Sequence, residues 1–144
     1  AASDVYKRQA LDENYVIDRE AYLSYFRKMH RLFPKCKKMV MAVRNQIASS
    51  HHTLSGLLYD TVEDQLYTTR IYDIQPIVDP MGVGDAFIAA YIHAHQKWGD
   101  ENQYCLDFSL SASAIKNTIP GDQNLVSEEE IISNMTSSGG RIQR

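Results

Sequence analysis

The sequence predicts an α/β fold in one globular unit. Apolar residues recur at helical spacing in 18–33, which indicates an amphipathic helix. The consecutive apolar residues 39–43 are typical of a strand that helices cover on both faces. A length of 144 residues with 44% hydrophobic residues suits a single domain with its own core. No linker, internal repeat or low-complexity block divides the chain.

The first predicted element is a surface helix over 18–33. Asp18 is its expected N-cap, and Pro34 ends it because proline cannot continue a helix. Its apolar face consists of Tyr22, Leu23, Phe26, Met29 and Phe33.

The strands are expected to form a mixed sheet. The run 39–43 is predicted as a central parallel strand. The strand-like runs 55–60 and 66–72 are joined by the polar turn 61–65, which predicts an antiparallel β-hairpin.

Three helices are predicted in the second half. The segment 84–98 is apolar nearly all round, which favours a buried helix. The segment 105–117 carries small and apolar residues and is expected to be a second packed helix. Ser127 and Glu130 form a capping box for a short helix over 128–134.

The two ends are assigned separately from the domain. Residues 1–9 begin without Met, lack a fitting periodicity and resemble translated sequencing-adapter sequence, so they are excluded as a non-native segment. Residues 10–135 form the domain. Residues 136–144 are Ser/Gly-rich and are predicted to be a frayed tail.

Composition excludes several kinds of partner. A net charge of −3 carries no basic excess for a nucleic acid or an anionic membrane, so a small molecule is the expected partner. Cys36 and Cys105 are far apart, which argues against a disulfide framework or a zinc site and for reduced thiols. Without a membrane-length apolar run or a signal segment, we expect a cytoplasmic location.

The segment 77–87 carries the clearest chemistry. An apolar strand end runs into Gly82 and Gly84, and Asp85 follows on the first turn of a helix. Free N–H groups and the dipole at such a helix start favour an anion, and glycines let a phosphoryl group approach closely. Asp85 is placed to accept the proton of an attacking hydroxyl. Taken alone, a G-x-G-D sequence is more typical of an acidic helix N-cap after a turn.

The nonapeptide 79–87 resembles the second signature of the PfkB, or ribokinase-like, carbohydrate kinases, which is D-x-x-G-A-G-D-x-F. All fixed positions match except that Val83 replaces the middle Ala, which keeps the backbone N–H. The similarity extends over nearly everything after Asp18. It implies a Rossmann-like three-layer sandwich, with the loop backbone at Gly82, Val83 and Gly84 stabilising the transferring phosphate and Asp85 as the catalytic base.

Within this family, the chain is most similar to the 2-keto-3-deoxygluconate kinases. Arg44, at the end of the apolar strand, resembles a strand-end arginine that reaches the substrate, and a guanidinium suits a sugar-acid carboxylate. Arg44 equally fits a solvated arginine at a strand end. Asp122 resembles a substrate-side aspartate, and Pro-Gly-Asp is also an ordinary turn.

The resemblance implies that ATP lies along Val83 and Gly84 and against the helix carrying Ala112 and Asn117. The family's usual Thr-x-Gly-x-x-Gly stretch is replaced by 43–48, which lacks both glycines. No N-x-x-E metal motif is present, so Mg²⁺ is implied by ATP chemistry and the family, and no metal ligands are assigned.

Other polar groups are interpreted as structural. The pair His51-His52 is expected in a solvated loop, and His93 and His95 point to different helix faces, which excludes a metal pair. The basic run 35–38 is interpreted as a solvated strand entry. Ser109, Ser111 and Ser113 are interpreted as small residues for close helix packing.

The leading functional hypothesis is therefore an ATP-dependent kinase of a sugar acid, with a homo-oligomer of the full-length enzyme compatible with the resemblance. The family's N-terminal part, with its first glycine-rich signature and β-lid, has no counterpart here, so this chain alone is expected to be a C-terminal fragment without activity. A kinase for ribose, fructose or a nucleoside and a non-catalytic nucleotide-binding module are the alternatives.

Overall fold

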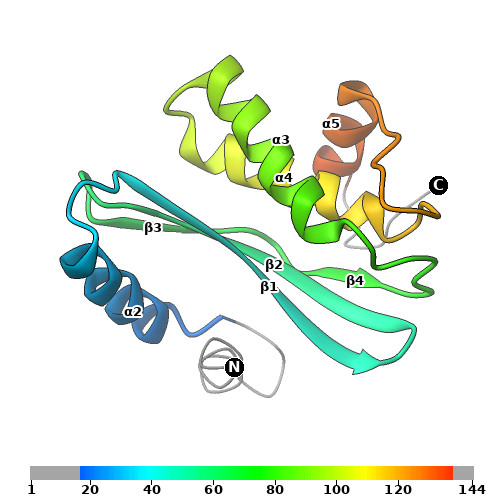
Figure 1. Ribbon diagram of the computed structural model, residues 1–144, viewed down its shortest axis with the longest axis horizontal. Helices are drawn as coiled ribbons and strands as arrows, with labels where there is room; N and C mark the ends of the chain where they lie inside the picture. Colours follow the sequence, from blue (N-terminus) through cyan, green and yellow to red (C-terminus); the bar gives the residue numbers. More distant parts are fainter. Residues whose placement is uncertain (1–16, 138–144) are drawn as a thin grey trace.

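The computed structural model describes residues 17–137 and has three layers (Figure 1). A four-stranded sheet separates one helix from three others. The helices are α2 (Arg19–Leu32), α3 (Val83–Trp98), α4 (Asn102–Lys116) and α5 (Glu128–Thr136), and the strands are β1 (Lys38–Ala48), β2 (His51–Asp60), β3 (Gln65–Thr68) and β4 (Tyr72–Ile74). Of the helices in this range, none has the length and apolar character that a membrane span requires.

The predicted α/β three-layer class is confirmed. The segment 1–9 and nearly all of the tail 136–144 lie outside the described residues. The helix starts are also confirmed: Asp18 accepts a hydrogen bond from the Ala21 amide at the start of α2, and Ser127 and Glu130 form the capping box of α5.

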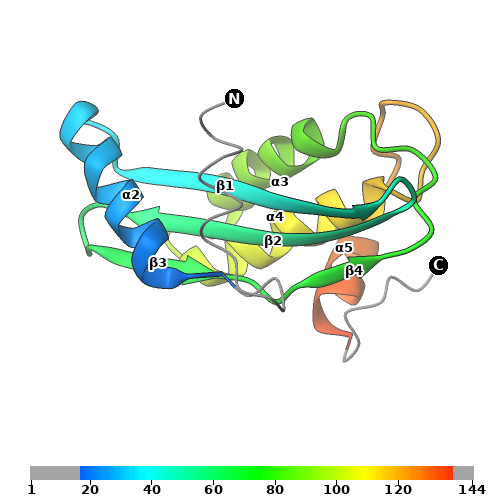
Figure 2. The same ribbon diagram turned by 90° about the horizontal axis from the view of Figure 1, so that it is seen from below.

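The predicted mixed sheet is wrong for the described strands. β2 pairs antiparallel with β1 along one edge, and with β3 and then β4 along the other (Figure 2). The run 39–43 is therefore an antiparallel strand. An unbroken apolar run shows that both faces are covered, but it does not specify the direction of the neighbouring strand.

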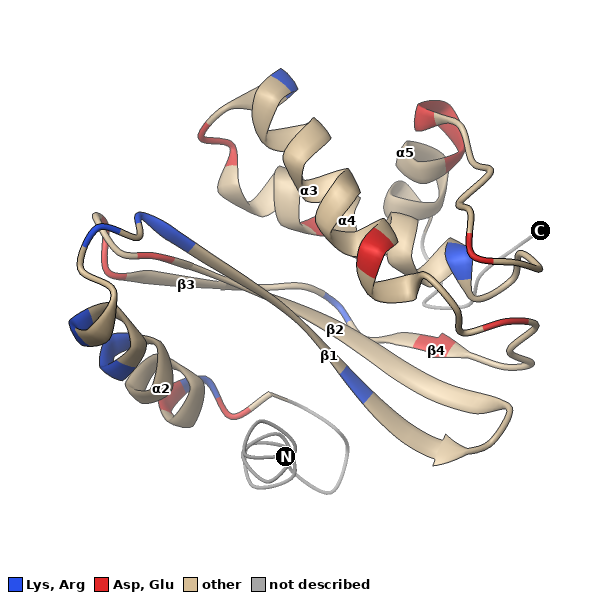
Figure 3. Ribbon diagram, in the orientation of Figure 1, with Lys and Arg blue, Asp and Glu red and all other residues tan. Residues whose placement is uncertain are grey.

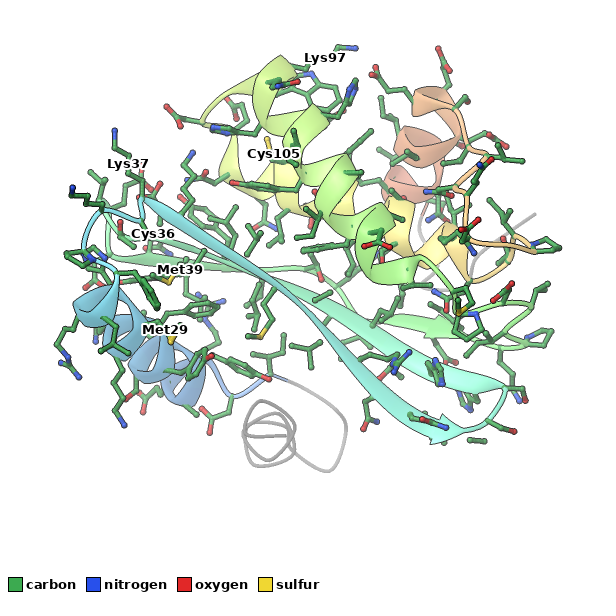
Figure 4. All side chains as sticks on the ribbon, in the orientation of Figure 1. Met29, Cys36, Lys37, Met39, Lys97 and Cys105 are labelled. Atoms are coloured by element: carbon green, nitrogen blue, oxygen red, sulfur yellow. The ribbon has the colours of Figure 1, made fainter. Side chains whose placement is uncertain are left out.

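Both faces of β1 are covered, as the run predicts. Val40 and Ala42 pack toward the core under α3 and α4, whereas Met39, Met41 and Val43 pack toward α2. Figure 4 shows Met39 and Met29 in the layer between α2 and the sheet. The same figure places Cys36 and Cys105 in different parts of the fold, and both thiols are free.

β1 continues beyond the predicted strand. The segment 44–48 lacks the family glycines, and it remains paired with β2 except for an irregularity between Gln46 and Ala48. His51 and His52 consequently begin β2 and do not lie in a solvated loop; His52 is buried. The run predicted at 66–72 is interrupted, since β3 ends at Thr68.

α2 is fixed to the β2–β3 hairpin. The Phe26 and Tyr59 rings stack with centroids 5.6 Å apart. The Arg27 guanidinium donates two hydrogen bonds to the Asp64 carboxylate, at 3.0 and 2.6 Å, and the Tyr59 hydroxyl donates a third at 2.6 Å. The Arg27 and Tyr59 hydrogen bonds lower the pKa of Asp64 to about 2.

The two helices above the sheet differ in burial. α4 is buried along most of its length, and the predicted packing role of its serines is confirmed: Ser109, Ser111 and Ser113 donate to the carbonyls of Cys105, Ile131 and Val83. α3 is not the wholly buried helix that its composition predicts. Its outer face exposes Ile88 and Ile92, at 45% and 53%.

Candidate active site

The predicted anion-binding loop runs into the first turn of α3. Gly82 is the N-cap in a left-handed conformation, with φ 74°, and provides no side-chain cap. The first amides of a helix have no carbonyl partner within the helix. Val83, which follows, is buried in the core between the sheet and the helices α3 and α4, and it anchors the turn. The start of α3 therefore presents backbone donors without a side chain to satisfy them.

Gly82 is required for a second reason, which is its contact with the loop after α4. A Cβ atom at this position would lie 2.3 Å from the Asp122 carbonyl oxygen. Real Cβ atoms do not approach an oxygen this closely, so only glycine permits the two loops to touch. This contact brings Asp122 beside the start of α3.

Asp79 fastens the same two loops together. Its Oδ1 accepts from the Met81 amide at 2.9 Å, and its Oδ2 accepts from the Gly121 amide at 2.8 Å. These two hydrogen bonds lower the pKa of the Asp79 carboxyl. The Asp79 carboxylate thus holds the loop 120–122 against the glycine loop, a positioning role that the sequence analysis did not assign.

Gly84 and Asp85 are exposed on the first turn of α3. A Cβ atom added to Gly84 would have no heavy atom within 4 Å, so no packing in the described chain requires a glycine there. Asp85 makes no hydrogen bond or ion pair with any residue in 17–137. Acidic residues occur at the start of α3 and in the loops beside it (Figure 3). An unpaired carboxylate next to open helix amides is suited to receive a proton during attack on a bound phosphoryl group.

The end of α4 supports this site from inside the fold. The Asn117 carbonyl accepts from the amides of Val78 and Asp79, at 2.8 and 3.2 Å, and its side chain is buried against α4 carbonyls. Lys116 is wholly buried, and its Nζ donates to the Ile119 carbonyl at 3.0 Å. The Asn117 backbone carbonyl therefore holds the loop, while the Asn117 side chain is bonded to α4. A direct nucleotide contact by Asn117 remains a prediction.

A cleft of about 280 Å³ opens between α3, α4 and the segment leading into α5. Ala112 lines it from α4. Ala86 lines it from the first turn of α3, and it directly follows Asp85 in the sequence. The predicted nucleotide residue Ala112 thus shares a cavity with the turn that follows Gly84. The lining residues are Ala86, Ala89, Ala90, His93, Phe108, Ala112, Asn124, Val126, Glu128 and Ile131.

Arg44 occupies a different place from the other predicted site residues. It lies inside β1 opposite Leu54, and not at a strand end. Leu54 belongs to the core under α3 and α4, so strand alternation directs Arg44 to that same face of the sheet. Burial, and then the Arg44 charge, lowers the pKa of His52 nearby. No hydrogen bond or ion pair joins Arg44 to the loop residues within 17–137.

Two polar groups lie outside the sequence predictions. Lys38 does not form a solvated strand entry, because its ammonium pairs with Asp100 and its side chain is 14% exposed. Lys116 is a cation within a small-residue stretch of a packed helix, and that position in the sequence was a usable sign of burial. For Asn124 in the cleft, no comparable sign was available.

Comparison with known proteins identifies similar structures but no matching sequence family. No protein-family model matches the chain, and no curated protein matches it. The crystal structure of 2-dehydro-3-deoxygluconokinase from Thermotoga maritima matches with a TM-score of 0.76 and 30% identity, over 83% of this chain and 35% of that one. A PfkB family carbohydrate kinase from Listeria grayi matches with a TM-score of 0.74 and 30% identity, over 78% and 34%.

A third structure, a provisionally assigned 2-keto-3-deoxygluconate kinase from Enterococcus faecalis, has a TM-score of 0.69 over 92% of this chain and 37% of that one. At 15% identity it supports the fold alone. The chain spans about one third of the length of the solved structures that it matches.

Proposed function

The chain belongs, by fold and by sequence similarity, to the PfkB family of carbohydrate kinases, and on that premise we propose that the whole protein transfers a phosphoryl group from ATP to a sugar-acid hydroxyl. The observation that carries the proposal is the start of α3. There, Gly82 contacts the Asp122 backbone, and it is followed by uncapped amides, an open Gly84 and an Asp85 that has no partner within residues 17–137.

Each site residue has a defined part in the proposed reaction. The acceptor hydroxyl oxygen attacks the γ-phosphorus, the bond to the ADP oxygen breaks, and Asp85 takes the hydroxyl proton. The amides of Val83, Gly84 and Asp85, together with the α3 dipole, stabilise the negative charge on the transferring group. Asp122 binds the acceptor, and it lies in the loop 120–122 that Asp79 holds against the glycine loop.

The site fits Mg²⁺ carried by the nucleotide. Within 17–137, no three His, Cys, Asp or Glu side chains are grouped to hold a metal ion. Mg²⁺ usually keeps several waters and takes one or two carboxylates besides the phosphates, and Asp85 and Asp122 are both exposed here. When bound with ATP, Mg²⁺ neutralises charge on the phosphates.

The proposed acceptor is 2-keto-3-deoxygluconate, phosphorylated to its 6-phosphate. One similar structure is a 2-dehydro-3-deoxygluconokinase, and the Arg44 guanidinium, on the α3 side of the sheet, has the charge that a sugar-acid carboxylate requires. A neutral acceptor such as ribose, fructose or a nucleoside would have no use for that charge. The two alternatives are therefore distinguished by Arg44.

The direct test is an assay of the whole protein with MgATP and each acceptor. We expect turnover of 2-keto-3-deoxygluconate, and we expect Asp85→Asn to lower kcat by about 10²–10⁴-fold, because proton acceptance is removed, with the ATP Kd within about twofold. Glu129→Gln is the matched control, since Glu129 is also an exposed acid in the first turn of a helix. Unchanged turnover in Asp85→Asn would exclude Asp85 as the base.

The acceptor class is tested separately with Arg44→Met. Loss of a charge-assisted hydrogen bond should raise the KM for the sugar acid by about 10- to 100-fold, while the KM for ribose remains unchanged. An equal effect on both acceptors, or none on either, would favour the neutral-acceptor alternative. If no acceptor is phosphorylated but ATP still binds, the protein is a nucleotide-binding module.

A further inference from the structure

The cleft between α3, α4 and α5 contains a polar atom whose partner is missing from the described chain. Asn124 Nδ2 donates to the Ala112 carbonyl at 3.2 Å, which fixes the orientation of the side-chain amide. The other end of the amide must then be the oxygen. Asn124 Oδ1 is buried and receives no hydrogen bond from any residue in 17–137.

A buried acceptor without a donor is costly, so its position indicates where a ligand is expected to supply one. The carboxylate in the cleft lining, that of Glu128, already has partners on both oxygens. One Glu128 oxygen pairs with His93 Nε2 at 2.8 Å, and the other pairs with Lys97. Figure 4 shows Lys97 near the outer end of α3. Asn124 Oδ1 is thus a buried acceptor of this cleft that has no donor within residues 17–137.

The walls of the cleft suit a flat, apolar ring. Ala86, Ala89 and Ala90 present only methyl groups from α3, and Phe108 and Ile131 provide apolar surface from the facing helices. The volume of about 280 Å³ lies near the lower limit of small-molecule sites, which run from roughly 300 to 1,000 Å³. This size fits a ring system better than a complete nucleotide.

The position of the cleft along α3 also fits one end of a nucleotide. Ala86 lies two residues beyond Gly84, and Ala90 lies about 9 Å along the helix from Gly84, at 1.5 Å rise per residue. A nucleotide whose phosphates bind at the start of α3 would therefore have its base within reach of the cleft.

We propose that the cleft binds the nucleobase and that Asn124 Oδ1 accepts a hydrogen bond from its exocyclic amino group, which makes Asn124 a specificity-determining residue for ATP. This inference rests on the proposed kinase function. It adds to that function a reason for the choice of base, because a base without the amino group leaves the buried oxygen unpaired.

The test compares ATP with purine ribonucleoside 5′-triphosphate, which lacks only the 6-amino group. Nucleotide Kd is measured by titration calorimetry on the whole protein. We expect the wild-type protein to bind ATP about two- to tenfold more tightly, the range of one net neutral hydrogen bond. Asn124→Leu should bind both nucleotides equally. Gln123→Leu, at the exposed neighbouring position outside the cleft lining, should keep the wild-type preference.

The ratio of the two affinities separates specificity from a general loss of packing, because loss of the Ala112 hydrogen bond affects both nucleotides alike. Equal binding of the two nucleotides by the wild-type protein would overturn the inference without any variant, even if Asn124→Leu does not fold. A preference that survives in folded Asn124→Leu would also overturn it. If the protein phosphorylates its acceptor with both nucleotides equally well, the kinase proposal stands and only the role of Asn124 fails; if it binds neither, both proposals fail.

Discussion

The first turns of α3 and α5 both have backbone N–H groups without a partner inside the helix, and they differ in whether side chains cap these groups. At α5, Ser127 accepts from the Glu130 amide and Glu130 accepts from the Ser127 amide, so side chains of the helix satisfy its donors. At α3, a glycine in the left-handed region replaces the cap, and no side chain closes the turn. The start of α5 therefore has its donors satisfied within the chain, whereas the start of α3 leaves donors free for a ligand.

The difference shows that uncapped amides lower the stability of a helix but leave hydrogen-bond donors free for a ligand. Uncapped amides reduce helix stability, and a cap contributes about 0.5–2 kcal/mol. α3 lacks that contribution, and its first turn is held instead by contacts from elsewhere: the Asp122 backbone against Gly82 and the Asp79 carboxylate between the loops. Rigid support with open donors is the arrangement that preorganised anion sites need.

Gly82→Ala should have the largest effect on this arrangement. The added Cβ meets the Asp122 oxygen at 2.3 Å, and φ of 74° is unfavourable for alanine. We expect kcat to fall about 100-fold, because the turn and the Asp122 loop separate, and the unfolding free energy to fall by about 2–4 kcal/mol. Enzyme kinetics and chemical denaturation measure the two effects.

The matched control for Gly82→Ala lies at the other end of the same helix. Gly99 also has a positive φ, of 57°, but a Cβ there would have no heavy atom within 4 Å. Gly99→Ala should therefore strain the backbone without changing kcat. A similar fall in kcat for both variants would show that the contact with Asp122 is unimportant.

Asp79→Asn should have a smaller effect, since the amide oxygen can still accept one of the two hydrogen bonds. We expect kcat to fall about tenfold. The folded pKa of Asp79 is lowered, chiefly by the Met81 and then the Gly121 amide. The carboxylate therefore stabilises the fold above its unfolded pKa, near 3.8, and this contribution is lost as the pH falls through the lower folded value.

The pH dependence provides a second measurement for Asp79. The difference in unfolding free energy between the wild type and Asp79→Asn should be constant near pH 7 and should shrink below about pH 4. Denaturation titrations at several pH values give this difference. If it stays constant down to pH 2, the carboxylate does not hold the loops.

Gly84→Ala should change activity and stability in opposite directions. The position is helical and open, so alanine should raise the unfolding free energy by about 0.5–1 kcal/mol. Its methyl group would occupy the space that the phosphoryl group needs, and we expect kcat/KM for ATP to fall about tenfold. A more stable variant with full activity would contradict close approach of the phosphate at Gly84.

Ser127→Ala should have the smallest effect on activity. Removal of the α5 cap is expected to lower the unfolding free energy by about 0.5–2 kcal/mol and to leave kcat within about twofold. Thermal unfolding and steady-state kinetics measure these effects. A large loss of activity here would mean that the start of α5 takes part in the reaction, and the contrast with α3 would fail.

Local features were predictable from the sequence because they depend on neighbouring residues. The N-cap at Asp18, the α5 capping box and the glycine loop before Asp85 each involve groups within a few positions of one another. Strand direction was not predictable, since the run 39–43 is compatible with either kind of partner.

The sequence by itself determined the α/β class, the resemblance carried by 79–87 and the choice of Asp85, because an ordered series of residue types specifies a turn, a helix start and an acid. Only the tertiary structure decided that Gly82 must admit the Asp122 backbone, that Asp79 joins two loops and that Asn124 Oδ1 lies in a cleft without a donor from residues 17–137. These are contacts between segments about 40 residues apart, or between helices, and packing alone brings them together. The open start of α3 combines both levels: its chemistry is local, and its rigidity comes from the fold.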